Sequence, residues 1–130
     1  TEKTTEQALK EFNQDYINFL LLSLKIDKLH KSNLGYGNPN IKLILDKEIW
    51  TSEINNGILS TNKQQTDKED IIIQTSKKEI INILLSENIK SSLENSLRSR
   101  KIEIKLVADK IELASKGYLS MYNNLAENKI

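Results

Sequence analysis

Apolar residues in the first part of the chain recur at every third or fourth position, the spacing of one face of an α-helix. Thr4 and Gln7 have the spacing of a capping box, in which two side chains close the start of a helix. We therefore predict one long helix over residues 5–28 with a wide apolar stripe. The clearest members of the stripe are Leu9, Phe12, Tyr16, Leu20 and Leu24.

The pattern changes after residues 34–40, a segment that holds the single proline and several turn-forming residues. Short runs in which apolar and polar residues alternate follow, and alternation is typical of β-strands. Asn56-Gly57 separates the second run from the third and is a strong hairpin signal, because both central residues of a type I′ turn need positive φ. We predict a meander of four antiparallel strands, with a polar loop at 62–69 before the fourth. The four runs are 41–45, 48–54, 58–61 and 70–75.

Helical spacing returns after the fourth of these runs. Ser76 and Glu79 form a capping box that predicts a helix starting at the next residue after Ser76. A second capping box at Ser91 and Glu94 predicts that the helical segment breaks in two near Asn88. The apolar stripe of this segment consists of Ile81, Leu85, Ile89, Leu93 and Leu97.

Residues 101–107 alternate strictly, which predicts a half-buried strand with Ile102, Ile104 and Leu106 on its apolar face. Asp109 is expected to cap a last helix, which Gly117 would weaken in its middle. The order of elements predicts an α+β domain with a mostly antiparallel five-stranded sheet covered on one face by helices.

The length of 130 residues suits one hydrophobic core. We expect a single domain over 1–130, in which an N-terminal helix at 1–33 precedes an α+β core at 41–125. The longest apolar stretch, residues 16–24, is much shorter than the roughly 20 residues that span a bilayer.

Two stretches of the chain carry a family resemblance. In residues 70–85 (DIIIQTSKKEIINILL) a hydrophobic strand runs into a capped helix that ends in a double leucine. In residues 93–125 a short helix leads into KIEIKLVAD and then an amphipathic helix. Together with the preceding strands, they resemble the sterol carrier protein 2 (SCP2-like) family of lipid-binding domains. The chain departs from that family where glycines are usual, since it has Ser86, Ser99 or Arg100, and Ala108 there.

The resemblance implies a curved sheet with helices on one face and an apolar tunnel that accepts a fatty acyl chain, a sterol or a similar lipid. Removing apolar surface from water yields roughly 25 cal/mol per Å², so such a ligand needs no polar contact. The same residues can instead meet as an ordinary core, and Trp50 can fill a sheet face instead of stacking on a ligand. The candidate ligand-binding residues are Trp50, Ile81, Leu85, Ile89, Leu93, Leu97, Ile104, Leu106, Tyr118, Met121 and Tyr122.

The composition excludes several classes of site. The chain has no cysteine and only one histidine, His30, so thiolate chemistry, disulfides and multi-histidine metal sites are excluded. It also lacks a GxSxG elbow and a phosphate-binding glycine loop. Lys and Arg number 19 against 18 Asp and Glu, and this balance gives no general attraction to nucleic acid. We therefore predict no catalytic residue, no metal, no cofactor and no nucleic-acid partner.

Two charged clusters need a separate interpretation. Asp67, Glu69 and Asp70 could hold a cation, but their spacing matches no calcium loop, and we expect a solvated loop there. A basic group around residues 98–105 is interleaved with acidic residues, unlike the surface of a nucleic-acid binder.

The sequence thus predicts non-enzymatic binding or transfer of a hydrophobic ligand in the cytoplasm, with transient contact to a membrane. The alternative is a structural or protein-interaction domain with a filled core. In that case the apolar N-terminal helix would pair with a second copy or with a partner.

Overall fold

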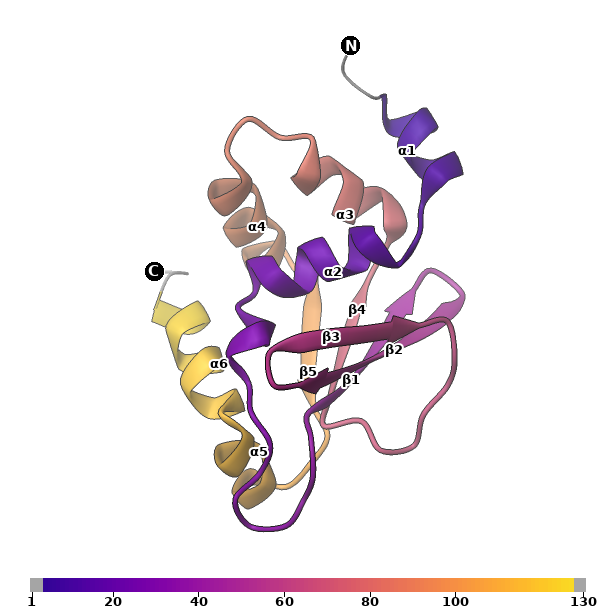
Figure 1. Cartoon of the computed structure of the whole chain (residues 1–130). Helices are drawn as coiled ribbons and strands as arrows, with labels where there is room; N and C mark the ends of the chain where they lie inside the picture. The colour runs from indigo at the N-terminus through magenta and orange to yellow at the C-terminus, as the bar shows by residue number, and fades with distance from the viewer. Residues whose placement is uncertain (1–3, 128–130) are drawn as a thin grey trace.

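The computed structural model describes residues 4–127. The protein has the predicted α+β architecture, with helices at both ends of the chain and a five-stranded sheet between them (Figure 1). The elements are α1 (Thr5–Glu11), α2 (Gln14–Ser23), a 3-10 turn η1 (Ile26–Lys28), β1 (Asn40–Leu45), β2 (Glu48–Asn55), β3 (Ile58–Asn62), β4 (Ile71–Thr75), α3 (Lys77–Leu84), α4 (Ile89–Arg98), β5 (Glu103–Leu106), α5 (Lys110–Lys116) and α6 (Tyr118–Glu127).

The strand order is β3-β2-β1-β4-β5, and the sheet is mixed. Three neighbouring pairs are antiparallel, as predicted, but β4 runs parallel to β1. The predicted four-strand meander is therefore wrong at its last step, because the chain crosses back from the edge strand β3 to the middle of the sheet. Ile71 and Ile73 are fully buried in β4, and a run of isoleucines suits a strand with neighbours on both sides.

The β2–β3 hairpin turns as the sequence predicts. Asn56 and Gly57 have φ values of 53° and 80°, which are the positive values that a type I′ turn needs. This turn sets the register in which Ile54 lies opposite Leu59.

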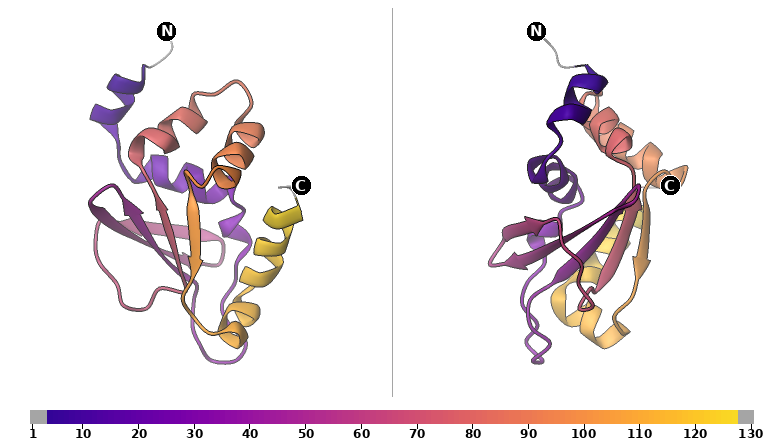
Figure 2. Two further views of the ribbon diagram at one scale, coloured as in Figure 1. Left: turned by 180° about the vertical axis from the view of Figure 1, so that it is seen from behind. Right: turned by 90° about the vertical axis from the view of Figure 1, so that its right-hand side faces the viewer.

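The helices cover one face of the sheet, and the left view of Figure 2 shows the sheet from its other side. Leu43 lies at the centre of the covered face, between Trp50 of β2 and Ile73 of β4. The helix α2 buries its apolar stripe in the same core, with Leu20 and Leu21 fully inaccessible to solvent.

The predicted N-terminal helix is broken into three pieces. The capping box of Thr4 and Gln7 is present at its start, as expected. Phe12 leaves the helical conformation, and Asn13 then caps α2 by accepting a hydrogen bond from the backbone N–H of Asp15. Lys25, with φ 66°, ends the helical path before η1. Asparagine competes with the backbone for hydrogen bonds, which is why it favours a cap over a helix interior.

The middle helical segment breaks near Asn88, as predicted, but with a different cap. The side chain of Asn88 accepts the hydrogen bond from the N–H of Ser91, so Asn88 caps α4 and Ser91 lies inside the helix. Ser76 caps α3 by accepting from the N–H of Glu79. The carboxylate of Glu79 accepts a hydrogen bond from Ser96 and so connects α3 to α4.

The last strand and the last helix are shorter than predicted. Lys101 and Ile102 donate their N–H groups to the carbonyl of Ser96, so β5 begins only after this turn. Asp109 caps α5 as expected, whereas Gly117 (φ 94°) does more than weaken the helix and divides it into α5 and α6. Among the described residues, no helix is long and apolar enough to cross a membrane.

Candidate functional site

The predicted ligand-binding residues fall into an interior group and a surface group. Ile104 is half-buried. Leu85, Ile89 and Leu106 are exposed, which contradicts their assignment to the lining of an enclosed cavity. Tyr122 belongs to α6, but its side chain lies outside the described part of the chain. The buried members are Trp50, Ile81, Leu93, Leu97, Tyr118 and Met121.

Two of the exposed residues lie at the α3–α4 turn, which is far from the sheet in Figure 1. Leu85, at the end of α3, is 42% exposed, while Ile81 one turn earlier is fully buried. Ile89, at the start of α4, is 38% exposed, while Leu93 one turn later is buried. Residues four apart share one face of a helix, so each apolar stripe runs from an exposed to a buried position. The stripe of α4 reaches the core cluster through Leu93, whereas Ile81 of α3 is buried outside that cluster.

Leu106 is exposed because β5 is the last strand of the sheet. It lies opposite Ile71 of β4, on the face that the helices cover in the middle of the sheet. Its side chain is nevertheless 41% exposed. Alternation in the sequence predicts the face on which a residue lies, but not its distance from the sheet edge.

Trp50 fills the covered face of the sheet beside the N-terminal segment. Its ring meets the ring of Phe12 edge-on, with the centroids 6.5 Å apart, and Phe12 stacks on Tyr16. The indole N–H donates to a carboxylate oxygen of Glu48 at 3.2 Å. Trp50 therefore has protein neighbours on the core side and a hydrogen-bond partner at its polar edge.

A buried charge network, which the sequence did not reveal, lies at the other end of the sheet. Asp70 and Lys116 are both almost completely buried, and Nζ of Lys116 lies 2.8 Å from Oδ1 of Asp70. The hydroxyl of Tyr118 donates to Oδ2 of Asp70 at 2.9 Å, and the N–H of Asn40 donates to the same oxygen at 2.9 Å. The prediction that Asp70 belongs to a solvated loop is wrong, because the residue is fully buried immediately before β4 and is bonded to Lys116 of α5 and Tyr118 of α6.

The main chain of Asp70 connects the same elements. Its N–H donates to the carbonyl of Asn40, and its carbonyl accepts from the N–H groups of Val107 and Ala108. One residue thus joins the start of β1, the end of β5 and the α5–α6 junction. No local pattern predicts this arrangement, since Asp70 is separated from Lys116 by 46 positions.

The electrostatics of the network favour its charged, hydrogen-bonded form. Burial alone would lower the pKa of Lys116, but its hydrogen bonds to Asp70 and Glu112 raise it above the ordinary value. Burial, followed by the negative charge of Asp70, raises the pKa of Tyr118. A lysine that acts as a nucleophile needs a lowered pKa, so these shifts favour a structural role for the network.

We expect the protein to lose stability at alkaline pH because of this network. Both folded-state pKa values are raised, so the stabilising contribution is fully present below the ordinary values of 10.0 for tyrosine and 10.5 for lysine. It is lost as the pH rises through the folded-state values. Urea unfolding between about pH 8 and about pH 11.5 measures this loss, and Tyr118→Phe should reduce it. An unchanged alkaline slope in Tyr118→Phe would mean that the phenol does not contribute.

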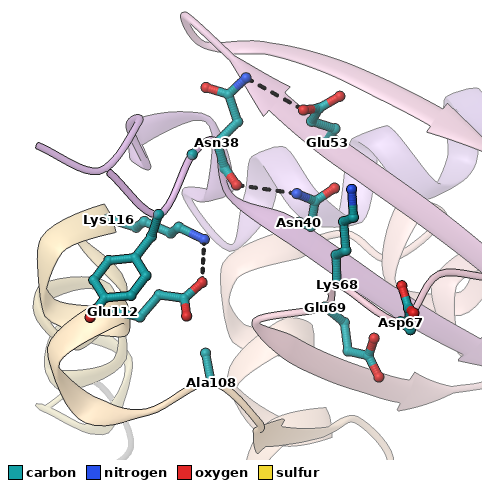
Figure 3. A pocket seen from close by; sticks show the side chains of 11 residues that line it. Asn38, Asn40, Glu53, Asp67, Lys68, Glu69, Ala108, Glu112 and Lys116 are labelled. Carbon is teal, nitrogen blue, oxygen red and sulfur yellow. Dashed lines mark hydrogen bonds and ion pairs between the residues drawn. The ribbon is translucent and has the colours of Figure 1, made fainter. Parts of the chain in front are cut away.

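A polar pocket of about 660 Å³ adjoins the network (Figure 3). Nζ of Lys116 points toward Glu112 on its wall and lies 2.7 Å from the carboxylate. On the opposite side Asn38 donates to Glu53, and Oε2 of Glu69 is buried without a hydrogen-bond partner.

None of the predicted ligand-binding residues lines this pocket. The part of the chain that the structure describes contains no group of three or more His, Asp or Glu able to hold a metal ion. The pocket is lined by Tyr36, Gly37, Asn38, Asn40, Glu53, Asp67, Lys68, Glu69, Ala108, Glu112 and Lys116.

Comparisons with known proteins identify no family. No family model matches the chain, and no curated protein matches it. Among solved structures, the chain is similar to a double mutant of the sec-alkyl sulfatase PisA1, with 13% sequence identity and a TM-score of 0.45. The match covers 66% of this chain and only 12% of that protein. A likeness at this level carries no argument about function.

Proposed function

We propose that this protein binds a hydrophobic ligand, such as a fatty acyl chain or a sterol-like lipid, between its sheet and the helices α3 and α4. The observation that carries the proposal is the pair of apolar stripes that start at exposed Leu85 and Ile89. The stripes continue inward through Ile81, Leu93 and Leu97, which are buried. On α4 the stripe leads from exposed Ile89 to Leu93 and Leu97 of the core cluster, whereas on α3 it leads to Ile81, which is buried outside that cluster. The resemblance to SCP2-like domains, whose ligands are lipids, points in the same direction.

The ligand enters by separating side chains that pack together in its absence. Leu93 and Leu97 belong to the same core cluster as Leu43 and Trp50, so an acyl chain replaces protein contacts with ligand contacts. Burial of roughly 300 Å² of acyl surface contributes about 7 kcal/mol toward this exchange. Leucine, isoleucine and methionine side chains keep an apolar surface in either arrangement. Binding therefore depends on the movement of α3 and α4 relative to the sheet.

The exposed ends of these stripes also provide the contact with a lipid source. Leu85 and Ile89 lie at a turn that projects from the molecule, where they can touch a membrane while a ligand passes. We expect this transfer to take place in the cytoplasm and to involve no catalytic step.

Acidic residues at the entrance should weaken binding. In a variant with both Leu85→Glu and Ile89→Glu, we expect at least a tenfold rise in the Kd for palmitate that carries a fluorescent nitrobenzoxadiazole group, or about 1.4 kcal/mol. Both sites are exposed, so the fold should persist. Ile58→Glu is the control, because Ile58 is also an exposed apolar residue, at 68% exposure, but lies in the β2–β3 hairpin. Equal loss in the control, or no binding by the unmodified protein, would refute the proposal.

The alternative role, in which the N-terminal helix pairs with another molecule, has less support. The stripe of α2 is buried against its own sheet, and only Leu22 and Leu9 remain as exposed large apolar residues of the two N-terminal helices. Pairing through the stripe would require α2 to leave the core.

A further inference from the structure

The strand β5 forms one edge of the sheet and, in residues 4–127, pairs only with β4 (Figure 2). An unpaired strand edge offers backbone groups to another strand. Glu103 and Lys105 of β5 are both exposed, and within the described chain neither side chain makes a hydrogen bond or an ion pair. They alternate with Ile104, which is half-buried on the opposite face.

The charges of β5 are complementary to a second copy of the same strand. When two copies run antiparallel with Ile104 opposite Ile104, Glu103 of each copy lies opposite Lys105 of the other. A shift of the pairing by two positions places Glu103 opposite Glu103, or Lys105 opposite Lys105. A shift by one position places Ile104 opposite a charged residue, and it joins the helix-covered face of one sheet to the uncovered face of the other. Among registers that pair residues within β5, Glu103–Leu106, only the one with Ile104 opposite Ile104 matches both charge and face.

The same register also covers apolar surface. Leu106, which is 41% exposed, lies opposite Ile102 of the other copy, a residue that precedes β5 and is itself already buried. Val107, the next residue along the chain, is exposed as well. The other edge strand, β3, has the sequence ILSTN and carries no charge that could match Glu103 or Lys105.

We propose that two copies of this protein pair antiparallel through β5, so that their two sheets join into one. The arrangement has two-fold symmetry and closes on itself, because the uncharged β3 edges lie at the outer ends. Charged residues on edge strands commonly prevent uncontrolled pairing. Here they disfavour the registers that place like charges of β5 opposite each other. This surface is separate from the N-terminal helices and does not depend on the ligand.

Sedimentation equilibrium tests the proposal. We expect the unmodified protein to dimerise with a dissociation constant on the order of 100 µM or below, as suits a small interface. Glu103→Lys places lysines opposite lysines, and Lys105→Glu places glutamates opposite glutamates. Each single variant should raise the dissociation constant at least tenfold, and the double variant should restore it to within about threefold.

A mixture of the two single variants provides the sharpest control. Neither variant should pair with itself, but in the mixture two lysines of one chain face two glutamates of the other, so a heterodimer should form. Both positions are exposed, and thermal unfolding of each variant verifies that the fold is intact. A monomeric unmodified protein, single variants that dimerise normally, or a mixture that stays monomeric would each overturn the proposal.

Discussion

Replacing Lys116 by methionine should lower the free energy of unfolding by about 3–5 kcal/mol. The substitution keeps the length of the side chain but leaves Asp70 as a buried carboxylate without its cation. Tyr118 and Asn40 still donate hydrogen bonds to Asp70, yet they carry no compensating charge. Removing one member of a buried ion pair costs far more than removing an exposed charge. Urea unfolding at neutral pH measures the difference.

Lys110→Met is the matched control for this prediction. Lys110 lies on the same helix, α5, but is exposed, so its replacement should change the free energy of unfolding by less than about 0.5 kcal/mol. Adding Asp70→Asn to Lys116→Met should recover part of the loss, because the amide keeps an acceptor for Tyr118 without a buried charge. Equal stability of Lys116→Met and Lys110→Met would contradict the role assigned to the network.

Leu20→Ala should cost about 2–5 kcal/mol, because Leu20 is fully buried between α2 and the sheet. Leu22→Ala, two positions away on the same helix, should cost much less, since Leu22 is 48% exposed. The single tryptophan, Trp50, lies in the same core and reports unfolding through its fluorescence. Similar losses in the free energy of unfolding for the two variants would contradict the packing of α2 against the sheet. They would favour the alternative, in which the apolar stripe of α2 binds another molecule.

The local elements of this fold could be predicted from the sequence because their signals lie within a few residues. The type I′ turn needs positive φ at two adjacent positions, which Asn56 and Gly57 adopt readily. Asp109 caps α5 by accepting a hydrogen bond from the backbone N–H of Glu112, only three residues along the chain. The direction of β4 could not be predicted in the same way. Alternation shows that Ile71 and Ile73 share a face, but not which strand lies beside them.

In the candidate site, too, the features set by neighbouring residues could be predicted, and those set by distant residues could not. The stripe from Ile81 to Leu85 follows from helical spacing, whereas the exposure of Leu85 depends on where the helix ends relative to the sheet. The network at Asp70 was missed because an acidic residue beside Asp67 and Glu69 has the local pattern of a loop. Its partner Lys116 becomes a neighbour only after the chain has folded.

The most direct test of ligand binding is photo-crosslinking with a C16 fatty acid that carries a diazirine near its methyl end, followed by mass mapping of the modified peptides. We predict adducts on the inward-facing residues of α3 and α4, with Ile81, Leu93 and Leu97 foremost, and their loss when excess palmitate competes. Adducts confined to exposed residues elsewhere, or labelling that palmitate does not reduce, would contradict binding between these helices and the sheet.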